Sequence, residues 1–202
     1  MNRIVPTTTD QELLTRAGSL HREAETVLAD LSLLERLTAV GRPIRIGSST
    51  AGVMIVPDID IGVLCASLDS ARICQTLQPL LDHPNIKRLN FIDERGMLQS
   101  TPGPENEGIY CGVRYLNDGV LHGKAWKIDV WFFPENAPRP EIAIRDRLLA
   151  ASPEARLAIL GVKSDLQAAG RYGAEVHGID VYRAVLDRGA RTIGEFDEVR
   201  AS

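Results

Sequence analysis

Two aspartates occupy positions that a β-strand ordinarily avoids. The stretch IGSSTAGVMIVPDIDI covers residues 46–61 and alternates Asp58 and Asp60 with Ile59 and Ile61. Side chains two residues apart on a strand share a face, so both carboxylates point the same way. Strands disfavour Asp because its carboxylate competes for backbone hydrogen bonds and needs hydration. On its own, such a pair is more typical of a solvated strand edge or turn.

A third carboxylate, Asp129, changes that interpretation. It lies in the segment KAWKIDVWFF, residues 124–133, whose aromatic and β-branched side chains predict a deeply buried strand. An unpaired charge there is costly. Three carboxylates on one sheet face repel each other unless a cation neutralises them, and Mg²⁺ or Mn²⁺ prefers such oxygen ligands. The predicted metal ligands are therefore Asp58, Asp60 and Asp129.

Gly47 and Ser48 precede the aspartates at the end of a short predicted strand. Glycine allows close backbone approach, and a helix that begins at Ser49 would turn free N–H groups toward an anion. The Ser48 hydroxyl adds a donor. Lys127 lies two residues before Asp129 and so shares its strand face. We predict that Gly47, Ser48, Ser49 and Lys127 contact phosphates.

The helices and strands that must position these residues are predicted from the spacing of apolar residues, which repeats about every 3.6 residues in a helix and every 2 in a strand. Thr8 and Thr9 precede Gln11 and Glu12 in two overlapping capping-box patterns, which predict the start of a long amphipathic helix that ends at Gly41. The sequence 117–119, Asn-Asp-Gly, predicts an antiparallel hairpin between the strands that flank it. Strands are predicted at 43–48, 58–65, 86–94, 108–116 and 124–133, and helices at 67–83, 140–150, 153–169, 175–188 and 192–200.

Strands first and helices afterwards predict an α+β fold, with a mixed sheet flanked by helices and an all-helical C-terminal appendage. The predicted division is a core with its N-terminal helix at 1–137 and a helical region at 138–202. The apolar faces of these helices could pack inside one chain or across a homodimer.

Composition narrows the choice of partner and compartment. The formal net charge is −4 with acids and bases interspersed, so no basic field favours nucleic acid. The cysteines Cys65, Cys74 and Cys111 lack metal-ligand spacing and indicate buried, reduced thiols. Neither a signal peptide nor an apolar run of about 18 residues is present. We expect a cytoplasmic protein with no membrane contact.

The run Ile46-Gly47-Ser48, followed after nine residues by Asp58-Ile59-Asp60-Ile61, resembles the signature of the nucleotidyltransferase superfamily, which includes DNA polymerase beta and the aminoglycoside adenylyltransferases. The resemblance covers about residues 40–133, and Asp129 matches the third aspartate. The tail GIDVYRAVLDRGARTIGEFDEV is similar to the helical C-terminus of small bacterial members. This resemblance implies that the aspartates hold two metal ions and that Gly-Ser holds the phosphates of a nucleoside triphosphate, with ATP expected.

The sequence departs from that pattern at one place. Many small members have an arginine after Gly-Ser, whereas residues 50–52 here are Thr-Ala-Gly. Another cation must then contact the triphosphate, and Lys127, Lys163 and Arg171 are candidates. Tyr172 could stack on a base or pack between helices.

The predicted reaction moves a nucleoside monophosphate from a nucleoside triphosphate to a hydroxyl of a small molecule or protein, and releases pyrophosphate. Asp58 and Asp60 would bridge both metals, and Asp129 would bind the metal that activates the acceptor hydroxyl. The alternative is a non-catalytic regulatory protein that binds a nucleotide or a partner on the same fold. That class typically lacks a metal ligand, and none is missing here. A template-dependent polymerase needs an electropositive channel, so that class is disfavoured.

Overall fold

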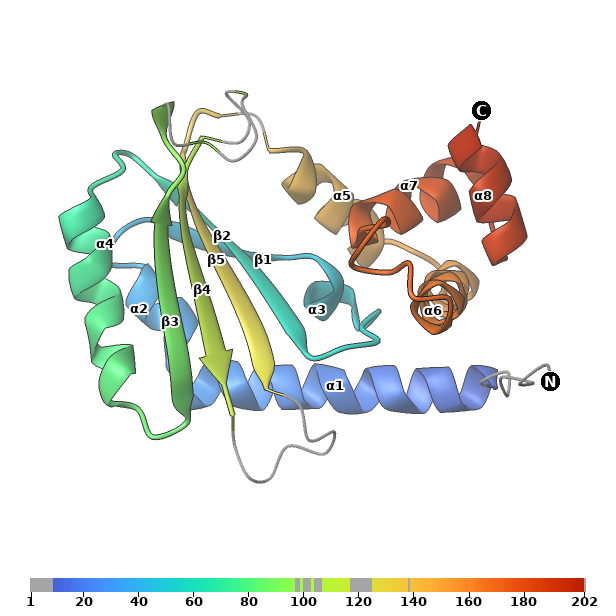
Figure 1. Cartoon of the computed structure of the whole chain (residues 1–202), viewed down its shortest axis with the longest axis horizontal. Helices are drawn as coiled ribbons and strands as arrows, with labels where there is room; N and C mark the ends of the chain where they lie inside the picture. The colour runs from blue at the N-terminus through green and yellow to red at the C-terminus, as the bar shows by residue number, and fades with distance from the viewer. Residues whose placement is uncertain are drawn as a thin grey trace.

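The computed structural model describes residues 9–96, 99, 103, 107–116, 125–137 and 139–201. The predicted turn residues 117–119 lie outside the described residues, as do residues 97, 98, 100–102, 104–106 and Pro138. Figure 1 shows one sheet, with a long helix beneath it and a group of helices at one end. The α+β class predicted from the sequence is confirmed.

The sheet has five strands in the order β1-β2-β5-β4-β3. Only β2 and β5 are parallel among these neighbours, and the other three pairs are antiparallel, which makes the sheet mixed. The predicted antiparallel pairing of the strands around residues 117–119 is confirmed. The strands are β1 Arg42–Ile46, β2 Asp58–Cys65, β3 Ile86–Asp93, β4 Ile109–Tyr115 and β5 Trp126–Pro134.

The helices agree closely with the predicted ranges after the sheet and less well before it. In the first part of the chain they are α1 Asp10–Asp30, α2 Leu33–Leu37, α3 Ser48–Ala51, α4 Ser70–Leu77 and the 3-10 helix η1 Gln78–Asp82. The C-terminal helices are α5 Pro140–Leu149, α6 Pro153–Ala168, α7 Gly178–Arg188 and α8 Ile193–Ala201.

The prediction of a single helix up to Gly41 is wrong. The capping box at Thr9 and Glu12 is present, but Ser32 has a φ of 45° in the left-handed region and separates α1 from α2. Periodicity alone hides this break, because Leu33 and Leu37 continue the apolar pattern. Both leucines are fully buried. The turn at Ser32 lets α2 pack its own apolar side onto the sheet.

One face of the sheet is covered by α1, α2 and α4, and it forms the larger apolar core. Along β5, Trp126, Ile128, Val130 and Phe132 are buried in this core. The alternate residues of β5 face the other side, so Trp131 is only half-buried and not deeply buried as predicted.

The cysteine prediction is correct at two of the three positions. Cys65 and Cys111 are buried, whereas Cys74 is exposed. Helix α4 buries Ile73 and Leu77, one turn apart, and this turns Cys74 toward solvent.

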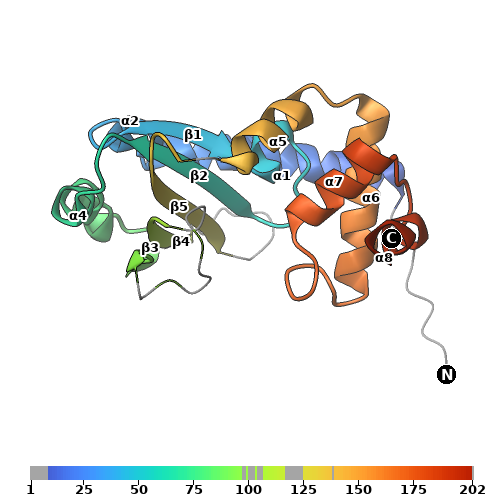
Figure 2. The same ribbon diagram turned by 90° about the horizontal axis from the view of Figure 1, so that it is seen from above.

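A second apolar core joins α1 to the C-terminal helices. Leu13 and Ala17 of α1 pack with residues of α5 to α8 and with Val53 and Ile55 of the segment between α3 and β2. Figure 2 shows these helices grouped at one end of the sheet, over the N-terminal half of α1. The apolar face of α1 is therefore used within the chain. The boundary near residue 137 stays a prediction.

None of the helices in the described part of the chain is long and apolar enough to cross a membrane.

Candidate active site

The parallel pairing of β2 and β5 brings three carboxylates to the open face of the sheet. Asp60 lies opposite Asp129, and Asp58 lies opposite Lys127. One oxygen from each of the three aspartates lies within 4.8 Å of the others. The structure thus places the predicted metal ligands together, and their oxygens suit a hard divalent cation.

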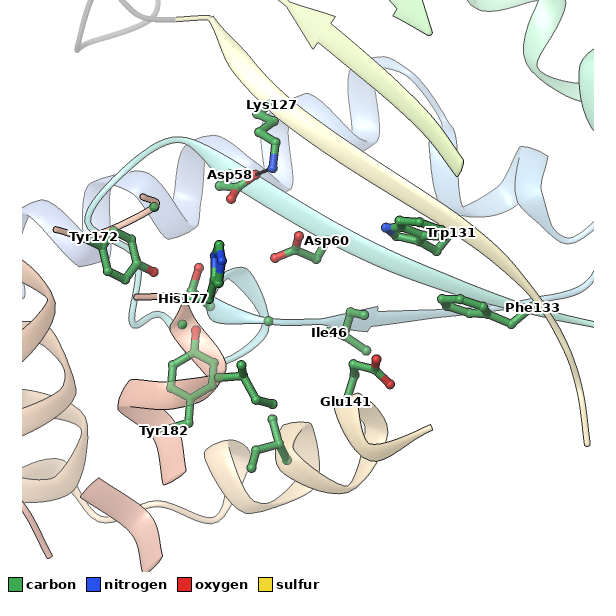
Figure 3. Close-up of a pocket in the computed structure, with 16 residues that line it drawn as sticks. Ile46, Asp58, Asp60, Lys127, Trp131, Phe133, Glu141, Tyr172, His177 and Tyr182 are labelled. Carbon is green, nitrogen blue, oxygen red and sulfur yellow. Dashed lines mark ion pairs between the residues drawn. The ribbon is translucent and has the colours of Figure 1, made fainter. Parts of the chain in front are cut away.

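Lys127 occupies the same face and pairs with two of these carboxylates. Its Nζ lies 2.5 Å from Asp129 Oδ2 and 3.7 Å from Asp58 Oδ1, and Figure 3 shows the pair with Asp58. Burial lowers the pKa of Lys127, but attraction to Asp58 and Asp129 outweighs burial and leaves the pKa raised. Lys127 is therefore positively charged at neutral pH, and its ammonium group offsets part of the negative charge of the aspartates.

Asp60 lies in surroundings that disfavour its ionised form. Burial, followed by repulsion from Asp58 and Asp129, raises the pKa of Asp60 to about 7. Burial also raises the pKa of Asp58, and Lys127 opposes that rise. Three ionised carboxylates are therefore unfavourable here at neutral pH, and a bound divalent cation would relieve the repulsion.

Tyr110, which the sequence analysis missed, holds Asp129 from the neighbouring strand. Its hydroxyl donates a hydrogen bond to Asp129 Oδ1 over 2.9 Å. Burial and the nearby Asp129 raise the pKa of Tyr110, so the hydroxyl stays protonated as a donor. Gly112 lies directly opposite Asp129 on β4, and a β-carbon there would overlap the Tyr110 hydroxyl. The glycine thus makes room for this hydrogen bond.

Gly47 stands between β1 and α3 and brings the backbone close to the carboxylates. Its φ is 67°, and a β-carbon at this position would overlap Asp60 Oδ2. Ser48 lines the same cavity as Asp58 and Asp60. A hydrogen bond joins the Ser48 side chain to Tyr182 of α7. The two predicted phosphate-binding residues 47 and 48 therefore lie beside the carboxylates.

Ser49 is placed differently. It is fully buried and does not line the cavity. Its backbone oxygen accepts a hydrogen bond from Arg45 Nη2 over 2.9 Å, and Nδ1 of His21 lies 3.0 Å from the same oxygen. These contacts hold α3 against β1 and α1, so Ser49 supports the loop on the side away from the cavity.

A cavity of about 550 Å³ runs across the site. Figure 3 shows Asp60 near its middle, with Tyr172, His177 and Tyr182 at one end. Trp131 and Phe133 lie toward the other end. The aromatic side chains at the two ends come from different parts of the chain: the segment from Tyr172 to α7 supplies one end, and β5 supplies the other.

The cations proposed from the C-terminal helices have different surroundings. Lys163 is fully buried, and its Nζ donates to the Val53 carbonyl over 3.0 Å and to the Tyr182 hydroxyl over 2.8 Å. Burial lowers the pKa of Lys163 to about 7, although Asp60 and Asp58 oppose the shift. Lys163 therefore contacts the Ser48 loop indirectly, through Tyr182 and through Val53, whose amide donates to the Ser48 carbonyl.

Arg171 is bound elsewhere. Its Nη2 lies 2.7 Å from Asp197 Oδ1 of α8, and it does not line the cavity. Its neighbour Tyr172 lines the cavity, which is where an aromatic side chain must lie in order to stack on a base.

Comparisons with known proteins agree with this geometry at the level of the fold. No protein-family model matches the sequence, and no curated protein matches it. The solved structure of Cid1 in complex with its short product ApU has a TM-score of 0.53 and 15% identity, and the match covers 88% of this chain and 54% of that one. A cytoplasmic RNA terminal U-transferase gives a TM-score of 0.55 and 14% identity over 89% of this chain and 47% of that one.

The chain thus spans about half the length of these solved structures. The match covers nearly nine-tenths of this chain, so most of the fold described above is shared. The resemblance inferred from Gly47-Ser48 and the aspartates is therefore confirmed at the level of structure. The chain has the fold of the nucleotidyltransferase superfamily.

Proposed function

We propose that this protein is a metal-dependent nucleotidyltransferase, which moves a nucleoside monophosphate from a nucleoside triphosphate to an acceptor hydroxyl and releases pyrophosphate. One observation carries the proposal: the oxygens of Asp58, Asp60 and Asp129 lie within 4.8 Å of one another, beside the loop at Gly47 and Ser48. Carboxylates for cations and a hydroxyl-bearing loop for phosphates are what phosphoryl-group transfer requires.

The donor set fits Mg²⁺ or Mn²⁺, because it consists of carboxylate oxygens on a rigid pair of strands. Two such ions held by Asp58, Asp60 and Asp129 would supply positive charge to the attacking and leaving oxygens at phosphorus. The raised pKa of Asp60 supports this assignment, since a metal-free cluster keeps a proton that a cation would replace.

Ser48 and Gly47 would bind the triphosphate. The Ser48 hydroxyl donates to a phosphate oxygen, and Gly47 lets the loop lie directly against Asp60. Lys127 pairs with carboxylates in the metal-free protein, but its flexible stem keeps the ammonium within reach of a phosphate on the same face. ATP is the first nucleotide to test.

Asp129 and Tyr110 act on the acceptor. Its hydroxyl oxygen attacks the α-phosphorus, the bond from that phosphorus to the β-phosphate oxygen breaks, and pyrophosphate leaves. Asp129 accepts the proton of the hydroxyl, with Tyr110 holding its other oxygen in place. The acceptor is a small molecule or a protein, and the cytoplasm is the expected compartment.

Transfer is tested with ATP labelled at the α-phosphate or at the γ-phosphate. With Mg²⁺ and a panel of acceptors, the α-label should move to an acceptor, and the γ-label should appear in pyrophosphate. Asp129→Asn should abolish both signals. Asp82→Asn, an exposed aspartate outside the cavity, is the matched control and should behave as the parent. Metal-dependent ATP binding without any transfer would favour the non-catalytic alternative.

A further inference from the structure

The end of the cavity beyond Asp60 has no task in binding the triphosphate as proposed above. It is lined by Trp131 and Phe133 of β5, Ile46 of β1 and Glu141 of α5. In Figure 3, Trp131 lies between Asp60 and Phe133, with Glu141 below them. Tyr172 and Tyr182 lie on the opposite side of Asp60 in Figure 3, and the Ser48 side chain is hydrogen-bonded to Tyr182. This second end is therefore adjacent to the carboxylates but away from the proposed phosphate loop.

Trp131 is held as a fixed aromatic surface. Its ring is parallel to that of Phe133, with centroids 5.6 Å apart, and it is tilted against Tyr110, with centroids 5.0 Å apart. The guanidinium of Arg139 lies 3.5 Å from the Phe133 centroid and packs on that ring. Phe133 is buried, whereas Trp131 is half-buried and lines the cavity. Such a preformed indole can stack on a planar ligand at low entropic cost.

Glu141 brings an unused acceptor to the same end. Its Oε2 atom is buried, and within the described part of the chain it accepts no hydrogen bond. Pro140 and Glu141 form the first turn of α5, so this carboxylate lies at the start of the helix. A buried carboxylate oxygen without a donor is unfavourable, and a ligand N–H group would satisfy it.

The spacing along β5 defines what could bind. Trp131 follows Asp129 by two residues on the same face, which separates them by about 7 Å. In a nucleoside, one sugar ring separates a reactive hydroxyl from a planar base. A hydroxyl at Asp129 would therefore place its base against Trp131, near Glu141. A puckered aminosugar offers no planar face to such a ring.

We infer that this end of the cavity is the acceptor subsite, and that the acceptor is a nucleoside whose base carries an amino group that donates to Glu141. The inference rests on the proposed function for the reaction at Asp129, but the binding it describes does not need catalysis. The base stacks on Trp131, and the amino group of adenine, guanine or cytosine pairs with Glu141. Uracil offers only one N3–H donor between two carbonyl oxygens, and a carboxylate repels those oxygens.

Tryptophan fluorescence tests this subsite without a donor nucleotide. The chain has two tryptophans, and Trp126 is fully buried, so quenching by a stacked base reports Trp131. Titration in EDTA with the four ribonucleoside monophosphates should give quenching by AMP, GMP or CMP at a Kd roughly tenfold below that for UMP. An aminoglycoside should not quench. A short single-stranded oligonucleotide that ends in the preferred nucleoside shows whether a strand end or a free nucleotide binds more tightly.

Variants separate stacking from recognition of the amino group. Trp131→Leu should raise the acceptor KM on the order of tenfold, and Trp131→Phe, which keeps a smaller ring, should raise it less. Glu141→Gln should remove most of the discrimination against UMP. Glu154→Gln is its control, because Glu154 also follows a proline in the first turn of a helix, α6, but lies outside the cavity.

The outcomes distinguish this inference from the proposed function. Equal quenching by all four monophosphates, or no quenching by any of them, would overturn the inference even if ATP binds with Mg²⁺ and transfer occurs. If quenching is selective and depends on Glu141 but the protein binds no triphosphate, the nucleoside site is supported and the nucleotidyltransferase reaction is contradicted.

Discussion

The Oδ2 atom of Asp60 lies against the α-carbon of Gly47, so close that a β-carbon at position 47 would overlap the carboxylate. The φ of Gly47, 67°, is also one that other residues adopt only with strain. The glycine of the loop and the aspartate of β2 are therefore a single packed unit. A change at either residue should disturb both phosphate binding and metal binding.

Gly47→Ala should weaken metal-dependent ATP binding and lower the free energy of unfolding by about 1–3 kcal/mol. Gly52→Ala is its matched control: Gly52 has a φ of 66°, but the nearest atom to an added β-carbon is on His21 at 3.9 Å. Denaturant unfolding and ATP titration measure both effects. Equal losses of ATP binding in the two variants would mean that backbone strain, and not contact with Asp60, governs the site.

Tyr110→Phe should slow nucleotidyl transfer on the order of tenfold while the KM for ATP stays unchanged, because only the hydrogen bond to Asp129 is lost. Gly112→Ala should act the same way by displacing the Tyr110 hydroxyl. Tyr115→Phe is the control, since Tyr115 lies on the opposite face of β4 and donates to Asp30 over 2.6 Å. Its loss should cost stability without affecting transfer, and slowed transfer in this control would contradict the assigned role of Tyr110.

Ser48→Ala should weaken ATP binding by about 1–3 kcal/mol, the usual range for a hydrogen bond to a charged group. Ser152 caps α6 through a hydrogen bond from the Ala155 amide over 3.2 Å, so Ser152→Ala should cost about 1 kcal/mol of stability and no binding. Calorimetric titration and thermal unfolding separate the two effects. Unchanged ATP affinity in the Ser48 variant, together with lost stability, would make Ser48 a structural residue only.

Asp60→Asn should stabilise the protein in EDTA near pH 8 by more than about 1 kcal/mol. Folding raises the pKa of Asp60 from 3.8 to about 7, so the stability that its protonated form contributes is complete below about pH 4 and is lost as pH rises through about 7. The gain in the variant should therefore grow between these values. Urea unfolding from pH 4 to pH 8 measures it, and a gain that is flat across this range would remove the electrostatic explanation.

Asp129→Asn should destabilise the protein in EDTA, although Asp129 belongs to the same group of three carboxylates as Asp60. Asp129 accepts hydrogen bonds from Tyr110 and pairs with Lys127, so its replacement should cost about 1–3 kcal/mol. The same urea series measures this loss. A stabilised Asp129 variant would show that repulsion among the carboxylates outweighs these two contacts.

The strands and the aspartates could be predicted because a period of two fixes which residues share a face. This rule placed Asp58 with Asp60, and Lys127 with Asp129, from the sequence alone. It does not say which strands are neighbours. That β2 pairs with β5, and that Asp60 faces Asp129 across the pair, joins residues nearly 70 positions apart in the chain, and periodicity did not predict this pairing.

Tyr110 and the surroundings of Lys163 were not predictable for the same reason. Tyr110 contacts Asp129 only because β4 pairs with β5 in the register that sets Gly112 opposite Asp129. Lys163 looks like a surface cation in the sequence, but α6 packs it against Tyr182 and the Val53 carbonyl in the interior. The break at Ser32 was hidden because the apolar pattern continues through it.

Thermal unfolding with ATP and Mg²⁺, singly and together, tests the central claim most directly. Ligands that bind the folded state raise its stability, by about 2.7 kcal/mol at a hundredfold excess over Kd. Since Asp58, Asp60 and Asp129 must share a cation before they can face a triphosphate, the melting temperature should rise clearly only when both are present. An equal rise with ATP in EDTA and with ATP in Mg²⁺ would contradict the metal-dependent site.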